Sequence, residues 1–141
     1  MAAPRFWREN PSRYNLMGFK CNSCGRQFFP MRVICPVCRR KSVGKIERIR
    51  LSGEGIVFSF TEVHEGLEEL GKQTPYVIAM VELDGGARVT AQLADCDPCS
   101  VKIGDKVRVT LRKLSEEGRG GIIHYGYKFV PVERPQARTQ Q

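Results

Sequence analysis

The chain has 141 residues, of which 41% are hydrophobic, and it carries a formal net charge of +8. This length suits one domain, or one small module joined to one domain, and no apolar run approaches the roughly 20 residues of a membrane-spanning helix. The first residues contain no apolar segment of the kind that directs secretion, so we expect a cytoplasmic protein whose cysteines stay reduced.

Residues 1–17 are predicted to form a short helical arm that is broken near Pro11, because proline disfavours helical geometry in the residue before it. The arm holds three large aromatic side chains, Phe6, Trp7 and Tyr14. A short helix cannot bury them alone, so they pack either on the protein's own ribbon or barrel, or on another subunit. Aromatic residues are common anchors of subunit interfaces. The pattern leaves both alternatives open, and we count these three residues as candidate partner contacts.

Residues 18–45 contain two C-x-x-C pairs with ten residues between them, a spacing that predicts a zinc ribbon. Gly25 follows the first pair, where the turn needs a residue that tolerates a positive φ. Four thiolates make a closed tetrahedral site, so we expect one zinc ion per chain that holds structure and does not catalyse. Iron would use the same ligands, and the spacing does not exclude it. The predicted ligands are Cys21, Cys24, Cys35 and Cys38.

Charge is distributed unevenly along the chain. Residues 1–45 hold ten basic side chains and one acidic side chain, a net charge of +9, whereas residues 46–141 hold 13 basic and 14 acidic side chains, a net charge of −1. This asymmetry predicts that the first third faces an anionic partner: a nucleic acid, a nucleotide-bearing cofactor or an acidic protein surface. The alternative is a basic surface that only contacts solvent.

From residue 46 to residue 131, apolar and polar side chains alternate with a period of two, which predicts β-strands. Asp84-Gly85-Gly86 indicates a hairpin. A longer link before the fourth strand suits a five-stranded Greek-key barrel of the OB type. The five strands are expected near residues 56–63, 77–83, 88–93, 107–112 and 122–129.

In the last of these strands, Ile123, Tyr125, Tyr127 and Phe129 share one face, which we expect to be barrel core. Residues 132–141 are polar and are expected to form a flexible tail. The predicted fold class is therefore mainly β, with a helical arm, a zinc ribbon and a C-terminal five-stranded OB barrel.

The remaining candidates for chemistry are two histidines and a third C-x-x-C pair. His64 and His124 are isolated, and a lone histidine on a strand is usually a structural or exposed side chain. Cys96 and Cys99 are flanked by aspartates, whose charges raise the pKa of a thiol and so disfavour redox chemistry. We interpret Cys96 as a core thiol and Cys99 as incidental, and we expect no catalytic residue in this chain.

Family motifs are spread over nearly the whole chain. They read RFWRE at 5–9, RY at 13–14, GFKCNSCG at 18–25, FFPMRVICPVC at 28–38, LSGEG at 51–55, PYVIA at 75–79, TAQ at 90–92, VKIG at 101–104 and YGYKF at 125–129. Together they resemble the zinc-ribbon/OB-fold proteins associated with acyl-CoA enzymes, most closely the archaeal members.

This resemblance implies an N-terminal helical arm, a rubredoxin-like zinc ribbon and a C-terminal OB barrel. It also implies a non-catalytic scaffold subunit that bridges acetoacetyl-CoA thiolase and 3-hydroxy-3-methylglutaryl-CoA (HMG-CoA) synthase in the mevalonate pathway. Other members accompany thiolase-like or hydratase-like subunits that act on different acyl-CoA substrates, so the resemblance identifies the family more firmly than the pathway.

Coenzyme A (CoA) is a further candidate ligand, because arginine side chains suit its phosphate groups. We expect Phe28 and Phe29 to pack inside the ribbon rather than to stack on the adenine. The candidate partner or CoA contacts on the ribbon are Arg26, Arg39, Arg40 and Lys41.

A nucleic-acid-binding function is the alternative from a different class, since zinc ribbons and OB folds both occur in such proteins. A barrel with a net charge of −1 lacks the positive groove that this binding needs. Nucleic acid is therefore a disfavoured partner, although binding by the ribbon alone stays open.

Overall fold

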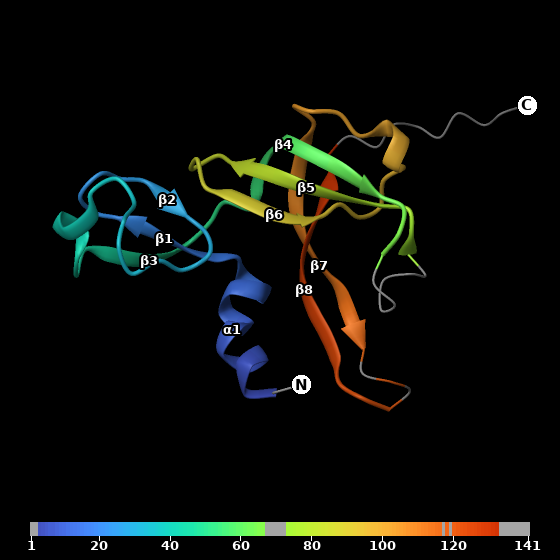
Figure 1. Ribbon diagram of the computed structural model, residues 1–141, viewed down its shortest axis with the longest axis horizontal. Helices are drawn as coiled ribbons and strands as arrows, with labels where there is room; N and C mark the ends of the chain where they lie inside the picture. The colour runs from blue at the N-terminus through green and yellow to red at the C-terminus, as the bar shows by residue number, and fades with distance from the viewer. Residues whose placement is uncertain (1–2, 67–72, 117, 119, 133–141) are drawn as a thin grey trace, which may run out of the picture.

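The chain folds into an N-terminal arm, a small ribbon and a barrel, which Figure 1 shows from left to right as the ribbon, the arm and the barrel. The computed structural model describes residues 3–66, 73–116, 118 and 120–132. The expected flexible tail therefore lies outside the described residues, apart from residue 132. Within the described part of the chain, no helix is long and apolar enough to cross a lipid bilayer.

The arm is one continuous helix, α1 (Ala3–Asn15), so the predicted break at Pro11 is wrong. Proline removes one backbone donor from a helix interior. Here an ion pair from Arg13 to Glu9, with Nη2 and Oε2 2.6 Å apart, links the residues on either side of Pro11 and supports the helix. α1 contacts both β1 (Met17–Cys21) and β8 (Ile123–Pro131). The arm therefore packs in part on its own chain.

The ribbon is a three-stranded antiparallel sheet in the order β2-β1-β3. β2 spans Gln27–Phe28 and β3 spans Ile46–Arg50. The sequence pattern predicts that residues 46–50 belong to the barrel, because the period of two begins there. Instead β3 pairs with β1 along its full length, from Ile46 opposite Cys21 to Arg50 opposite Met17. The second cysteine pair leads into a short 3₁₀ helix, Arg39–Ser42.

The barrel has the five predicted strands. Its sheet runs in the order β6-β5-β4-β7-β8. A parallel bridge between Leu93 and Phe129 closes it, and the Ala94 N–H donates to the Phe129 carbonyl at 2.8 Å. This closure between β6 and β8 gives OB topology. The remaining strand bounds are β4 (Glu54–Val63), β5 (Tyr76–Leu83), β6 (Arg88–Gln92) and β7 (Lys106–Glu116).

Local backbone requirements shape the loops between the strands, and the predicted hairpin at residues 84–86 is present. In the β5–β6 hairpin the Gly86 N–H donates to the Leu83 carbonyl at 2.7 Å, and Gly86 has a φ of +78°. In the link before β7, the Asp97 side chain accepts a hydrogen bond from the Cys99 N–H and caps a 3₁₀ turn, Pro98–Ser100. Gly53, between β3 and β4, has a φ of +76°, and a Cβ there would lie 2.6 Å from Val109 Cγ1. This bend therefore requires glycine.

One apolar core fills the barrel and extends under the ribbon. Leu16, which follows α1, and Leu51, which follows β3, belong to this core and so anchor the ribbon to the barrel. Each fully buried aliphatic side chain contributes about 1.5–3 kcal/mol. The buried members are Leu16, Leu51, Val57, Val77, Ala79, Val81, Leu83, Ala87, Val89, Leu93, Val101, Val107 and Phe129.

The outer half of β8 is not barrel core, contrary to the prediction. Phe129 is fully buried and Tyr127 is half-buried, but Ile123 is 46% exposed and Tyr125 is 41% exposed. The reason is that β7 and β8 continue as a two-stranded hairpin beyond the closed part of the barrel (Figure 1). The alternation of apolar residues is preserved there, but within the described residues no second sheet covers it.

Candidate metal centre and docking surfaces

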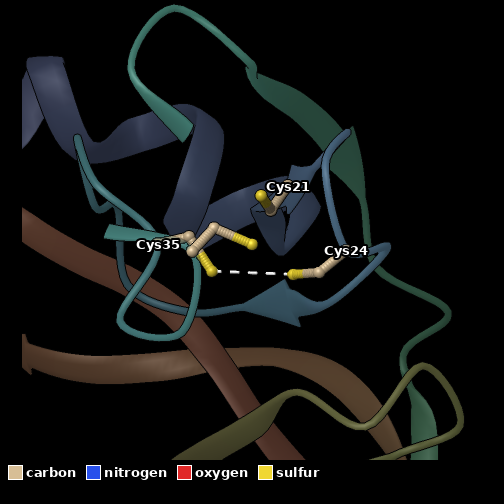
Figure 2. A group of neighbouring side chains, drawn as sticks. Cys21, Cys24 and Cys35 are labelled. Carbon is tan, nitrogen blue, oxygen red and sulfur yellow. Dashed lines mark hydrogen bonds between the residues drawn. The ribbon is translucent and has the colours of Figure 1, made fainter. Parts of the chain in front are cut away.

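The four cysteines of the ribbon converge on one point. Their Sγ atoms all lie within 4.8 Å of one another, and those of Cys24 and Cys35 are 3.7 Å apart (Figure 2). A tetrahedral zinc ion with Zn–S bonds of about 2.3 Å places its sulfur atoms about 3.8 Å apart. The thiols are free and not paired in disulfides. Cys21 and Cys35 are fully buried, whereas Cys24 is exposed.

Backbone hydrogen bonds give the two cysteine turns the same shape. The Gly25 N–H donates to the Cys21 carbonyl at 2.7 Å, and the Arg39 N–H donates to the Cys35 carbonyl at 2.8 Å. Both donors follow the second cysteine of their pair, and both have positive φ, +74° at Gly25 and +49° at Arg39. The first turn therefore uses the favoured residue, and the second holds an arginine in a less favourable conformation.

Ser42 supports the second turn and was missed by the sequence analysis. Its side chain is fully buried. Its Oγ accepts a hydrogen bond from the Cys35 N–H at 2.9 Å and donates one to the Arg39 carbonyl at 2.6 Å. The hydroxyl thus connects a metal ligand to the strained residue of the turn. In the sequence, only its position four residues after Cys38 indicates this role, and serine is so common near turns that the position alone does not identify it.

The protein environment shifts the pKa values of two of the thiols in opposite directions. The backbone N–H of Cys38 lowers the pKa of the Cys35 thiol to about 7. The neighbouring Cys24 side chain raises the pKa of the Cys38 thiol to about 12. Four sulfurs this close together resist collective deprotonation, and a divalent cation removes that resistance by binding all four thiolates.

The basic residues that the sequence predicts to contact a partner or CoA lie together at the metal end of the ribbon. Arg39, Arg40 and Lys41 are consecutive in the 3₁₀ helix after the second cysteine pair, and all three are exposed. Arg26 follows the first pair and is exposed as well. The structure thus brings these four side chains to one end of the ribbon, next to the four thiols.

Phe28 packs inside the ribbon, as expected, whereas Phe29 packs on the barrel. The Phe28 ring is stacked with Phe19 at a centroid distance of 6.5 Å. The Phe29 ring meets Tyr127 of β8 edge to face at 5.5 Å. Phe29 therefore joins the ribbon to the barrel.

Trp7 and Tyr14 of α1 lie next to the start of β8. Trp7 is 73% exposed, and Tyr14 is exposed as well. Both border a small cavity of about 100 Å³ that is also lined by Ile123 and Tyr125. Phe6 belongs to the same helix, but its side chain is outside the described residues. The contribution of β8 to this aromatic surface was not predicted.

The other candidates for chemistry lie in the barrel part of the chain, outside the cluster of four cysteines. Cys96 is half-buried against the barrel core, and burial, followed by Asp95, raises the pKa of its thiol. Cys99 is exposed. His64 is exposed and lies 3.6 Å from Glu62, whereas His124 is buried on β8.

Known proteins share both parts of this architecture. Residues 8–44 match the domain family described as "ChsH2, rubredoxin-like zinc ribbon domain", and residues 48–112 match "ChsH2, C-terminal OB-fold domain". A solved structure described as "Ltp2-ChsH2(DUF35) aldolase" has the same fold, with a TM-score of 0.68 over 94% of this chain and 98% of that chain at 24% identity. The sulfur geometry and the match to the zinc-ribbon family together establish a ribbon that binds one structural zinc ion.

Sequence relatives align with most of the chain. A "DUF35 domain-containing scaffold protein" of Methanothermobacter thermautotrophicus is 52% identical over 90% of this chain and 94% of its own length. A protein of the same description from Methanocaldococcus jannaschii is 48% identical over 92% of this chain and 90% of its own length. "Benzoylsuccinyl-CoA thiolase subunit BbsA" of Geobacter metallireducens is 32% identical over 82% of this chain and 75% of its own length. The chain therefore belongs to the family of DUF35 domain-containing scaffold proteins, in which a zinc ribbon precedes an OB fold.

Proposed function

We propose that this chain is a non-catalytic scaffold subunit of an acyl-CoA enzyme complex, in which it bridges acetoacetyl-CoA thiolase and HMG-CoA synthase. The observation that carries the proposal is the 52% identity, over 90% of the chain, to a DUF35 domain-containing scaffold protein. The similarity to a benzoylsuccinyl-CoA thiolase subunit supports a thiolase as one partner. The motifs that resemble the archaeal members support HMG-CoA synthase as the other.

One enzyme would dock on the arm surface, which we define as Trp7, Tyr14, Ile122, Ile123 and Tyr125. All five side chains are exposed and border the same cavity. Exposed apolar groups that gather in one place mark interaction sites, and tryptophan and tyrosine are frequent energetic anchors of interfaces. We keep Phe6, in the same helix, as a further contact that the sequence predicts.

The second enzyme would dock on the ribbon surface, which combines apolar and basic groups. Met31, Val33, Ile34 and Val37 lie in the loop that carries the second cysteine pair, and all are exposed, Val33 at 73%. Arg39, Arg40 and Lys41 follow immediately and, with Arg26, give this end its positive charge. An acidic rim on the partner would complement it. In Figure 1 the ribbon lies at the left end of the molecule, well away from the N-terminal end of α1.

A bridge between these two enzymes has a thermodynamic purpose. The condensation of two acetyl-CoA molecules to acetoacetyl-CoA is unfavourable at equilibrium. Immediate use of acetoacetyl-CoA by an irreversible second condensation draws the first reaction forward. A scaffold that holds the two active sites together raises the local concentration of the intermediate at the second site.

Co-expression of the three chains, followed by size-exclusion chromatography, tests this proposal. We expect one peak that contains all three chains and that separates into individual enzymes when the scaffold is omitted. A Trp7→Ala, Tyr14→Ala variant should lose one enzyme and keep the other. Assembly of the two enzymes without the scaffold, or elution of the scaffold at its own mass of 16.0 kDa beside them, would contradict the proposal.

A further inference from the structure

Solvent reaches the four metal ligands to different extents. Cys21 and Cys35 are 0% exposed, Cys38 is half-buried, and Cys24 is exposed. A cysteine sulfur that is bound to a metal ion is already a thiolate, and among thiolates the susceptibility to oxidation follows exposure. A dissolved oxidant therefore reaches Cys24 before the other three ligands.

The exposure of Cys24 comes from its place in the first cysteine turn. Residues 22–26 are all exposed, and a Cβ at Gly25 would have no atom within 4 Å beyond its own chain neighbours. In the second turn, by contrast, Cys38 is partly covered, and the buried Ser42 hydroxyl forms hydrogen bonds to the turn from behind. The two turns share a backbone shape but differ in how accessible their cysteines are.

A second sulfur lies close enough to react with Cys24. The Sγ atoms of Cys24 and Cys35 are 3.7 Å apart and come from different turns (Figure 2). A disulfide bond joins sulfur atoms at about 2.05 Å. The exposed first turn has open space around Gly25, so it can supply the movement that this bond requires.

The surroundings of Cys24 are positively charged. Arg26 and the basic residues 39–41 are exposed at the same end of the ribbon. Reactive cysteines are typically found in positive, partly exposed surroundings, because cations stabilise a thiolate. Cys99 is exposed as well, but the carboxylate of Asp97 lies beside it and accepts a hydrogen bond from its N–H. Exposure and positive charge therefore coincide at Cys24.

We propose that Cys24 is an oxidation site, through which a peroxide releases the zinc ion and unfolds the ribbon. The Cys24 thiolate attacks one oxygen of hydrogen peroxide, the O–O bond breaks, and a sulfenic acid and a hydroxide ion form. The Cys35 thiolate then attacks the Cys24 sulfur, the S–O bond breaks, and a second hydroxide ion leaves as the disulfide forms. The two sulfurs lose the two electrons that the peroxide gains. Two ligands remain, whereas a closed zinc site needs four.

Loss of the metal affects the ribbon and leaves the barrel folded. The fold of β1–β3 depends on the bound metal, whereas the barrel strands have an apolar core. The effect on docking rests on the proposed function: the ribbon surface would be lost, and the arm surface on α1 and β8 would be kept. Reduction of the disulfide by a thiol returns the four ligands, so the switch is reversible.

Treatment of the zinc-loaded full chain with hydrogen peroxide tests this proposal. A chromogenic chelator measures the released zinc, and alkylation followed by mass spectrometry identifies the oxidised cysteines in order of appearance. We expect Cys24 to be oxidised before the other ligands, followed by a disulfide between Cys24 and Cys35 and loss of the zinc ion. Dithiothreitol and added zinc should restore the metal content. The Cys99→Ser chain should behave in the same way, since Cys99 is outside the cluster of four sulfurs.

Cys24→His and Cys38→His form a matched pair of variants, because three cysteines and one histidine are a common structural zinc site. Cys24→His should lose zinc several-fold more slowly than the unmodified chain. Cys38→His, which keeps the exposed sulfur, should lose zinc at a rate similar to that of the unmodified chain. If Cys24→His does not load zinc, the order of oxidation in the unmodified chain decides between the outcomes.

Three results would overturn the proposal: oxidation of another ligand before Cys24, retention of zinc after Cys24 is oxidised, or equal rates of zinc loss from the two histidine variants. Co-purification with the two enzymes is a separate measurement that needs no oxidant. The scaffold proposal and this inference can therefore fail independently.

Discussion

The ribbon and the barrel are stabilised by different interactions. Each of the five barrel strands places at least one almost completely buried apolar side chain in the core: Val57, Val81, Val89, Val107 and Phe129. In the ribbon, the fully buried side chains are instead two metal ligands, Cys21 and Cys35, and the serine that supports them, Ser42. The barrel therefore folds around apolar groups, and the ribbon folds around a zinc ion.

This difference explains why the ribbon can expose so much apolar surface. Four Zn–S bonds fix the chain, so loop residues such as Val33 and Ile34 are not needed in a core and remain exposed. The two parts of the chain also differ in charge, since the first 45 residues carry a net charge of +9 and the remaining residues carry a net charge of −1. A metal-fixed module can therefore carry recognition groups without a large apolar core of its own.

The largest expected effect comes from removing the metal. Cys35→Ser takes away a buried ligand, and zinc binding contributes on the order of 10 kcal/mol to the folding of a ribbon of this kind. We expect loss of zinc, measured by elemental analysis, and loss of hydrogen-exchange protection in β1–β3 while β4–β8 stay protected. Cys99→Ser, at an exposed thiol, is the control and should keep one zinc ion per chain. A ribbon that stays protected without metal would refute the contrast between the two parts.

The corresponding experiment on the barrel creates a cavity in its core. Phe129→Ala removes a fully buried ring, and such changes cost about 3–5 kcal/mol. We expect a lower unfolding midpoint in urea, monitored by circular dichroism, with zinc content unchanged. Tyr125→Ala, on the exposed part of the same strand, should change the midpoint much less. Equal effects of the two substitutions would mean that the hairpin is as important to the barrel as its core.

A smaller effect is expected at the support of the metal site. Ser42→Ala leaves the Cys35 N–H and the Arg39 carbonyl without their hydroxyl partner, at a cost of about 1–3 kcal/mol. Partners behind the ligands typically change metal affinity by about 10- to 100-fold. Competition with a chelator should therefore extract zinc more readily from this variant than from a Ser59→Ala control, which changes an exposed barrel serine. Equal extraction would assign Ser42 no role in the metal site.

The sequence predicted the features that depend on local spacing. The ligands followed from two C-x-x-C pairs, and the barrel strands followed from a period of two. The hairpin at Gly86 followed from its glycines, since a positive φ there is a local requirement.

Features that depend on which strands meet in space were not predictable in this way. β3 continues the alternating pattern of the barrel, yet it pairs with β1, because alternation does not specify a partner. Ile123 and Tyr125 fit a core pattern, but they lie beyond the point where Leu93 and Phe129 close the barrel.

The smallest effect is expected from charges on the ribbon surface, and it tests whether recognition belongs to the ribbon. Charge reversal at Arg39, Arg40 and Lys41 should slow association with the partner enzyme by about tenfold and reduce its dependence on salt, since exposed charges act mainly on the rate of encounter. Reversal at Arg108 and Arg112 of β7 is the barrel control and should change the rate less, because Arg112 is already engaged with Asp95 at 2.7 Å. Stopped-flow measurements at two ionic strengths distinguish the two sets. A greater loss with the β7 pair would place the electrostatic recognition surface on the barrel, and the ribbon would then be a structural module whose positive charge serves another ligand.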